Sequence, residues 1–391
     1  MEHTKVQIWD KLFSMEKDIY KVAIQSNSVS LMQGLGGVSI LYDNLYCATG
    51  DEIYAKKNIE IISTITDSLS NSISSIRYYD GLSGNAFLFD YLLQKGYGDF
   101  GLNEIIEDCT DLLYETFLAE IDDLDFLHGA QGIFMFFLYQ KPKETSNKKI
   151  QEMMMHIVSK INDYITICKD GKSNAKINCG MAHGMVSYIL LLSKYLSKNN
   201  CQITRETLYK TVNLLFESET ENISSTSIFP SIINYYSLTK EAEYDVPLGW
   251  CYGDNVISLG LLKAGIVLQD NFIIEKAKKI ALATTKRDNI KSAIVYDACF
   301  CHGSSSIAHI FNKWYRYTGS SAFKDSYHLW INKTMELCSF ENGIGGFKQF
   351  SGENKYEKSI GLLDGACGVA LVLSDYATGK LTNWDRFFLL D

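Results

Sequence analysis

The chain has 391 residues, of which 46% are hydrophobic and 21% are charged, and its formal net charge is −9. This composition is typical of a globular protein with ample material for a core. The acidic balance argues against a nucleic-acid partner, which would need a basic field. A cationic or neutral peptide partner stays open.

The start of the chain, "MEHTKVQIWDKLFSMEKD", mixes charged with apolar residues and lacks the apolar block of a secretory signal. The longest uncharged run, residues 177–193, contains polar residues and glycines and does not indicate a membrane span. Ten cysteines in such a chain are typical of reduced thiols rather than of a disulfide framework. The sequence therefore predicts a cytoplasmic protein.

Helices dominate the expected secondary structure. The chain has only three prolines, strict alternation of apolar and polar residues is almost absent, and no linker-like segment divides it. We therefore predict one all-α domain over residues 1–391.

Seven apolar runs, each headed by a glycine, follow one another over residues 34–380, and each predicts a helix. The runs are "GLGGVSILY", "GLSGNAFLF", "GAQGIFMFF", "GMAHGMVSYILLL", "GWCYGDNVISLGLL", "FCHGSSSIAHIF" and "GACGVALVL". We align them at Gly37, Gly84, Gly132, Gly184, Gly253, Gly303 and Gly368. Several runs end at a second glycine that suits a left-handed helix cap, namely Gly50, Gly96, Gly265, Gly319 and Gly379.

Amphipathic segments such as 51–69 and 101–121 lie between these runs, with apolar residues three and four apart. Each repeat therefore offers an apolar inner helix and an amphipathic outer helix. Such pairs can stack as an open solenoid or close into a ring. An open solenoid would need polar caps at its ends. The first and last runs are as apolar as the middle ones, so closure into a ring is favoured. The prediction is an (α/α)7 toroid of seven inner and seven outer helices, with all glycine turns at one end of its axis.

Three turns carry side chains that bind soft metals or protons: "AHG" (182–184), "WCYG" (250–253) and "CHG" (301–303). Cys251, Cys301 and His302 supply two thiolates and an imidazole, a set suited to zinc, and leave the fourth position of a tetrahedron open. The alternative is that both cysteines are core thiols and that His302 caps a helix. Cys299 is a rival ligand, although two residues along a helix it faces away from Cys301.

These motifs, set within seven glycine-headed repeats from about Gly34 to Gly368, resemble the lanthionine synthetase C-like (LanC) family of lantibiotic cyclases. The resemblance implies a toroidal (α/α) barrel with zinc (Zn²⁺) at one end of the axis. It also implies a stand-alone, zinc-dependent lanthipeptide cyclase. Such an enzyme adds cysteine thiols of a precursor peptide to dehydroalanine or dehydrobutyrine and forms thioether rings. Zinc at an open position would hold the substrate cysteine as a thiolate.

The resemblance also implies catalytic roles for His183 as general acid or base, for Asp125 as the carboxylate that orients it, and for Tyr252 as a lining residue. Each also has a structural interpretation: a capping or core histidine, a solvated loop aspartate and a stacked tyrosine. Asp122 and Asp123 compete with Asp125 for its role.

Two more features qualify the resemblance. His128 is a further polar residue at the turn of Asp125 and is not expected to take part directly. Some relatives carry an arginine before the "WC" pair, whereas this chain has Pro247 there and no arginine. The polar stretch 217–229 is expected to form an exposed loop, either a plain insertion or a grip on the leader of a precursor.

Two other functions compete with the cyclase. One is protein prenyl transfer, which also uses a helical barrel and a zinc-bound thiolate, with a carboxylate among the metal ligands. The other is a non-catalytic zinc- and thiol-binding scaffold that holds glutathione or a peptide. For a cyclase, the expected partners are the leader and core of a dehydrated lanthipeptide precursor. A dehydratase and an ABC exporter would hold the protein at the inner face of the plasma membrane.

Overall fold

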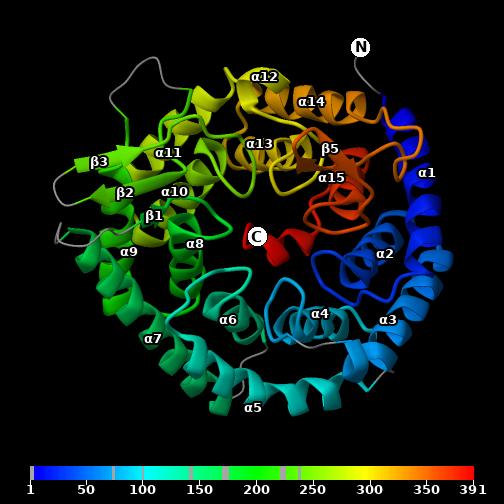
Figure 1. Cartoon of the computed structure of the whole chain (residues 1–391), viewed down its shortest axis with the longest axis horizontal. Coiled ribbons are helices and arrows are strands. Elements are labelled where there is room, and N and C mark those ends of the chain that lie inside the picture. Colours follow the sequence, from blue (N-terminus) through cyan, green and yellow to red (C-terminus); the bar gives the residue numbers. More distant parts are fainter. Residues whose placement is uncertain are drawn as a thin grey trace.

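Two concentric rings of helices make up the computed structural model, which describes residues 4–72, 75–98, 101–140, 144–169, 176–220, 226–236 and 239–391. Viewed down the shortest axis, the inner helices stand around a common centre and the outer helices enclose them (Figure 1). The predicted toroid is therefore confirmed.

The inner ring consists of the seven glycine-headed runs, and their near-complete burial explains why they are apolar on all sides. All ten residues of the third run are buried, for example. The inner helices are α2 (Leu35–Thr49), α4 (Leu82–Gln94), α6 (Ala130–Tyr139), α8 (Met185–Leu196), α10 (Asp254–Leu268), α13 (Ser304–Thr318) and α15 (Ala366–Thr378).

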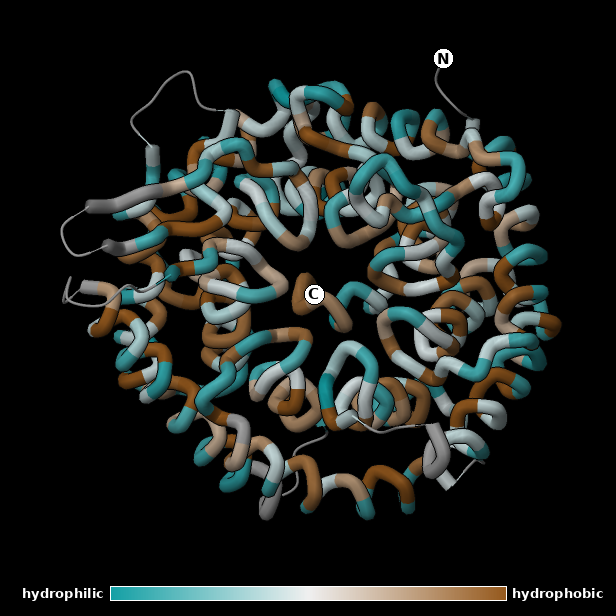
Figure 2. Tube along the Cα trace, in the orientation of Figure 1, coloured by the Kyte–Doolittle hydropathy of each residue, from teal (hydrophilic) through white to brown (hydrophobic). Residues whose placement is uncertain are grey.

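The outer ring consists of amphipathic helices whose apolar stripe packs on the inner ring and whose charged side faces water, as the hydropathy colouring shows (Figure 2). They are α1 (Lys5–Ala23), α3 (Glu52–Ser72), α5 (Leu102–Glu120), α7 (Glu144–Lys169), α9 (Gln202–Phe216), α11 (Asn271–Thr284) and α14 (Ser321–Glu336). Six of them follow their inner partner in the chain, whereas α1 packs against α15. The first helix of the chain thus completes the last repeat and closes the ring.

Short strands supplement the helices, which the all-α expectation did not include. An antiparallel sheet has the order β1 (Lys176–Asn178), β2 (Ile232–Tyr236) and β3 (Thr239–Ala242), with Ile177 opposite Ile233. β4 (Gln349–Gly352) and β5 (Lys355–Glu357) form a hairpin, and α12 (Ile290–Ala293) is a single extra turn. These elements lie in the connections that lead from an outer helix to the next inner helix, and they leave the toroid intact.

The stretch 217–229 was predicted to be an exposed loop, and its residues 221–225 lie outside the described residues. Its C-terminal part is anchored to the inner ring. The backbone N–H groups of Ile228 and Phe229 donate to the carboxylate of Asp254 at 2.8 and 3.0 Å. Burial raises the pKa of Asp254 to about 6, although these two donors act in the opposite direction. This part of the stretch is therefore packed rather than free.

The structure corrects the alignment of the seven repeats. The residues that cap the inner helices are Gly34, Gly81, Gly129, Gly184, Gly253, Gly303 and Gly365. Four of the glycines aligned from the sequence lie three residues further on, inside the first helical turn. That second glycine has a packing role: a Cβ added at Gly132 would lie 2.4 Å from the Cβ of Tyr78 in the preceding turn.

The C-terminal glycines are confirmed in part. Gly50, Gly319 and Gly379 cap α2, α13 and α15 in the left-handed conformation. Gly96 also has a positive φ, one residue beyond the cap of α4. The prediction that Gly265 caps a helix was wrong. This glycine lies within α10, which continues to a C-cap at Gln269 in the left-handed conformation. A Cβ at Gly265 would lie 2.6 Å from the side chain of Ile274 on α11, so this glycine serves close helix packing.

The segment 383–391 fills the centre of the ring, where Figure 1 places the end of the chain. The Tyr78 hydroxyl donates to the carbonyl of Phe387 at 2.9 Å, and the Trp250 indole donates to that of Phe388 at 3.1 Å. Both phenylalanines are fully buried. The axis is thus a packed core rather than a channel. Within the described ranges, no helix combines the length and the apolar character needed to cross a membrane.

Candidate functional site

The seven turns that precede the inner helices share one register, counted back from the capping glycine. Three residues before each glycine stands a fully buried large side chain: Leu31, Tyr78, Phe126, Met181, Trp250, Phe300 and Leu362. Directly before each glycine stands a polar side chain: Gln33, Asp80, His128, His183, Tyr252, His302 and Asp364. We call this second set the polar rim. We call the first set, the buried side chains, the apolar floor. The turns therefore present a polar rim above this floor at one end of the toroid.

Backbone hydrogen bonds link neighbouring turns. Six of the seven junctions between neighbouring turns contain such a bond. Each bond joins residues that lie two or three positions before the capping glycines. The pairs are Met32–Tyr79, Tyr79–Leu127, Met181–Cys251, Cys251–Cys301, Cys301–Leu363 and Leu363–Met32, with N···O distances of 2.7–3.2 Å. Within the described ranges, no backbone bond joins the third turn to the fourth. We call this junction the seam.

Cys251, Cys301 and His302 come together at the fifth and sixth turns. Their ligand atoms all lie within 4.8 Å of one another, and no other trio of His, Cys, Asp or Glu in the described part of the chain converges in this way. The backbone N–H of Cys251 donates to the carbonyl of Cys301 at 2.8 Å and fixes one turn on the other. A Cβ at Gly249 would lie 2.8 Å from the Cα of His302, so glycine is needed for this approach. This group could hold a metal ion.

The two sulfurs lie in direct contact as a disulfide pair, with their Cα atoms 5.4 Å apart. The other eight cysteines form no disulfide, as the sequence indicated for all ten. A metal needs Cys251 and Cys301 as two separate thiolates, so the disulfide and the metal-bound state exclude each other. The donor set fits zinc, because two thiolates and one imidazole leave one tetrahedral position open. Cys299 is fully buried and lies outside the converging group.

Tyr252 follows the first of these cysteines and is half-buried. Its hydroxyl accepts a hydrogen bond from the side chain of Asn178 at 2.9 Å. Its ring lies against Gly180, where an added Cβ would be 2.6 Å from the ring. Tyr252 is thus held in place at the rim rather than in the core.

His183 and Asp125 form a pair across the seam. Nδ1 of His183 lies 2.5 Å from one carboxylate oxygen of Asp125, and the His183 side chain is 39% exposed. The other carboxylate oxygen accepts the backbone N–H groups of Leu127 and His128, both at 2.8 Å. Asp125 is therefore fixed by its own turn and orients the imidazole. The exposure of His183 excludes the interpretation as a core histidine.

The rival carboxylates have other partners. Asp122 pairs with Lys160 on α7, and Asp123 accepts the backbone N–H of Asp125 at 3.0 Å. Neither is paired with His183. The sequence alone had left open which of the three aspartates forms this pair.

The pair perturbs both pKa values. The hydrogen bond to Asp125 raises the pKa of His183 above its usual value and outweighs burial, which acts in the other direction. Burial would raise the pKa of Asp125, but the hydrogen bond and charge of His183 lower it overall. The arrangement therefore favours a protonated imidazole beside an ionised carboxylate, and a protonated imidazole is the form that a general acid needs.

Two rim residues were missed or given little weight in the sequence. Asp364 receives a hydrogen bond from the Tyr79 hydroxyl at 3.5 Å, and burial raises its pKa although the charge of His302 acts in the opposite direction. The ring of His128 stacks on that of His183, with centroids 6.0 Å apart. With the glycines correctly aligned, the polar residue before each of them would have pointed to Asp364.

The protein is thus a helical toroid whose turns carry a potential metal group and a histidine–aspartate pair. Residues 25–389 match the family of lanthionine synthetase C-like proteins. The chain belongs to this family, as its motifs indicated.

Two relatives place the chain further. It is 23% identical over 410 aligned positions to the nisin biosynthesis protein NisC of Lactococcus lactis subsp. lactis, covering 98% of this chain and 93% of that protein. The solved structure of a nisin cyclase superimposes with a TM-score of 0.74 at 19% identity and covers 96% of this chain and 97% of its own. The second likeness shows that the toroid is shared over its whole length.

Proposed function

We propose that the protein is a zinc-dependent lanthipeptide cyclase. It adds cysteine thiols of a dehydrated precursor peptide to dehydroalanine or dehydrobutyrine and forms lanthionine or methyllanthionine rings. The observation that carries the proposal is the placement of Cys251, Cys301 and His302 on the same rim as the His183–Asp125 pair, in a chain of the lanthionine synthetase C-like family. The likeness to nisin cyclase supports it.

Cys251, Cys301 and His302 would hold the zinc ion, which when bound favours the thiolate form of an incoming cysteine. The apolar floor beneath the turns and the filled axis keep this end closed from below. A peptide therefore reaches the rim from outside the toroid and leaves in the same direction.

His183 supplies the proton that completes the addition. When sulfur bonds to the β-carbon, the double bond of the dehydro residue becomes an enolate, which needs a proton at its α-carbon. Nδ1 of His183 is held by Asp125, so Nε2 is the ring atom that delivers the proton. The thiol loses one proton and the α-carbon gains one, so the product has the mass of the substrate. Asp125 stabilises the imidazolium before transfer, and Tyr252 lines the same rim.

Both competing functions are less well supported. A prenyl transferase site would include a carboxylate ligand, whereas the converging group in the described residues contains none. A thiol-binding scaffold has no use for an imidazole whose pKa is raised by a fixed carboxylate.

The test uses zinc-loaded enzyme and its dehydrated precursor peptide, sought among the products of the neighbouring genes. We expect the peptide to lose its free thiols, measured by alkylation, without change of mass. Cys301→Ala should lose bound zinc and this activity together, whereas Cys299→Ala, a buried cysteine outside the group, should keep both. Thiols that persist with zinc-loaded wild-type enzyme would contradict the proposal.

The partners follow from the same function. The substrate would be the leader and core of the precursor, and a dehydratase and an exporter at the inner face of the plasma membrane would act before and after the cyclase. Co-purification of tagged protein with the products of the neighbouring genes tests this assembly, and recovery of the cyclase alone would argue against it.

A further inference from the structure

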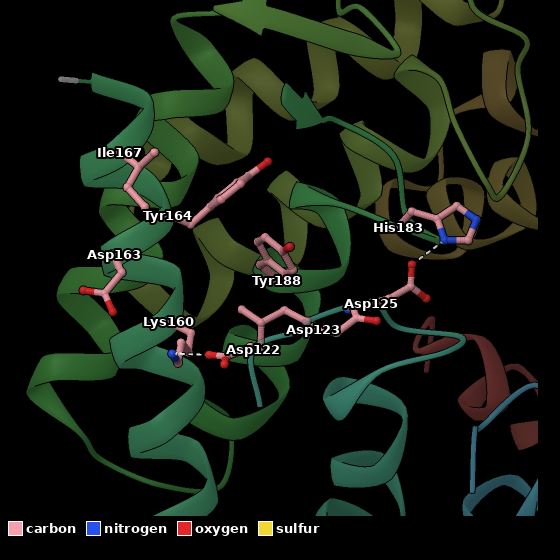
Figure 3. A pocket seen from close by; sticks show the side chains of 10 residues that line it. Asp122, Asp123, Asp125, Lys160, Asp163, Tyr164, Ile167, His183 and Tyr188 are labelled. Atoms are coloured by element: carbon pink, nitrogen blue, oxygen red, sulfur yellow. Dashed lines mark hydrogen bonds and ion pairs between the residues drawn. The ribbon is translucent and has the colours of Figure 1, made fainter. Parts of the chain in front are cut away.

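A pocket of about 460 Å³ lies at the outer side of the seam, where the turns of repeats three and four meet α7. Figure 3 shows it: Asp122, Asp123 and Asp125 come from the third turn, and Lys160 and Tyr164 come from α7. His183 stands at one end of the pocket. The pocket therefore opens beside the proposed proton donor, at the seam.

The pocket is acidic. Asp122, Asp123, Asp125 and Asp163 line it together with one described cation, Lys160. Four carboxylates and one ammonium group leave an excess of three negative charges when His183 is neutral and of two when it is protonated. These carboxylates do not converge as metal ligands, since the only converging group in the described residues is at the fifth and sixth turns. An extended organic cation fits this distribution better than a metal ion.

Tyr188 of α8 is a second feature that points to a ligand. Its side chain lines the pocket between the Asp122–Lys160 and Asp125–His183 pairs (Figure 3). The residue is only 8% exposed, and its ring packs edge-on against Tyr164. Its hydroxyl forms no hydrogen bond with a described residue, and it is not among the fully buried polar atoms, so it stays open to the pocket. A ligand group in the pocket would supply the missing partner.

We propose that this pocket is a subsite for a lysine or arginine side chain of the precursor peptide. The hydroxyl of Tyr188 would accept a hydrogen bond from the ammonium or guanidinium group, and the carboxylate of Asp123 would balance its charge. The occupied subsite would hold the dehydro residue next to His183. The inference rests on the proposed function, because it names where that substrate binds.

Binding is measured with peptides that cannot form rings, so the result does not depend on cyclase activity. Each fluorescein-labelled peptide contains one dehydrobutyrine and serine in place of cysteine. One set carries lysine at each of the two positions on either side of the dehydrobutyrine, and a matched set carries glutamine. By fluorescence anisotropy, we expect at least one lysine peptide to bind wild-type protein about tenfold more tightly than its glutamine match, as a hydrogen bond to a charged group allows.

Two variants remove the features that carry the proposal and keep the local structure. Tyr188→Phe keeps the ring and should abolish most of the tenfold preference. Asp123→Asn keeps the oxygen that accepts the Asp125 N–H and should reduce the preference about threefold, as expected for an exposed ion pair. The matched control is Asp108→Asn, an exposed aspartate on α5 outside the pocket, which should leave the preference unchanged.

Equal affinity of lysine and glutamine peptides at every position would overturn the proposal. So would a preference that survives Tyr188→Phe and Asp123→Asn, because it would then come from the net charge of the protein. If the lysine preference depends on both residues but ring formation is absent with the genuine precursor, the subsite stands and the cyclase assignment fails. If rings form without any lysine preference, only the subsite fails.

Discussion

The toroid holds two histidine–aspartate pairs, one at the rim and one buried in the core around its axis, and the two pairs behave in opposite ways. At the rim, the His183 side chain is 39% exposed and Asp125 raises its pKa. In the core, the His309 side chain is 1% exposed and lies 3.1 Å from Asp385. Burial lowers the pKa of His309 despite this carboxylate.

The surroundings explain the difference. Asp385 also contacts Lys313 directly, and the charges of Lys313 and His309 hold the pKa of its carboxyl low although burial acts to raise it. Nearby Asp375 receives the indole N–H of Trp384 at 2.9 Å, and burial raises its pKa to about 8. These groups bind the segment 383–391 into the core. The same residue types thus serve packing in the core and remain available for chemistry at the rim.

The largest expected effect separates the two histidines by activity. His183→Ala should reduce ring formation by about 10²–10⁴-fold, the usual contribution of a general acid, and leave zinc content and the free energy of unfolding nearly unchanged. His309→Ala should retain the rate per folded molecule and lose stability. Thiol alkylation measures ring formation by both variants, and urea denaturation measures their stability. Equal losses of activity would contradict the distinction between the two histidines.

The next effect concerns the buried pair in the core. Asp385→Asn leaves Lys313 and His309 without their buried carboxylate, so we expect the free energy of unfolding to fall by about 3–5 kcal/mol. Urea denaturation followed by circular dichroism measures this loss. Asp125→Asn is the matched change at the rim and should cost less than about 1 kcal/mol, because that pair is exposed. A similar loss of unfolding free energy for both substitutions would contradict the distinction between the core pair and the rim pair.

A smaller effect tests the pKa of His183. Because Asp125 raises this pKa, the wild type keeps its general acid to higher pH. In Asp125→Asn the imidazole loses its proton at lower pH, so the alkaline limb of the pH–rate profile should move to lower pH. Above the pKa, a shift of one unit lowers the rate about tenfold. An unchanged alkaline limb would show that the carboxylate does not support the acid.

The smallest effect is on stability. A raised histidine pKa contributes stability that is fully present below the unfolded-state pKa, about 6.5, and is lost as pH rises through the folded-state pKa. The difference in unfolding free energy between wild type and His183→Ala should therefore be largest in mild acid and vanish in mild alkali. Solvent screening of this exposed pair keeps it below about 1 kcal/mol. A difference that grows with pH would contradict the raised pKa.

The repeat pattern and the family were predictable because they depend on local sequence. Apolar runs between amphipathic segments specify inner and outer helices, and "WCYG" and "CHG" carry a donor set that is recognisable without coordinates. The structure brings Cys251, Cys301 and His302 together as expected. The partner of His183 was only one of three candidate aspartates until the turn geometry placed Asp125 against the ring.

The sequence by itself determined a helical repeat protein with thiols and imidazoles at its turns, because helix periodicity and donor chemistry are properties of neighbouring residues. Only the tertiary structure decided that α1 closes the ring on α15, that the segment 383–391 fills the axis, and that an acidic pocket opens at the seam. Each of these depends on surfaces far apart in the chain that bury one another, and no local pattern records which surfaces meet.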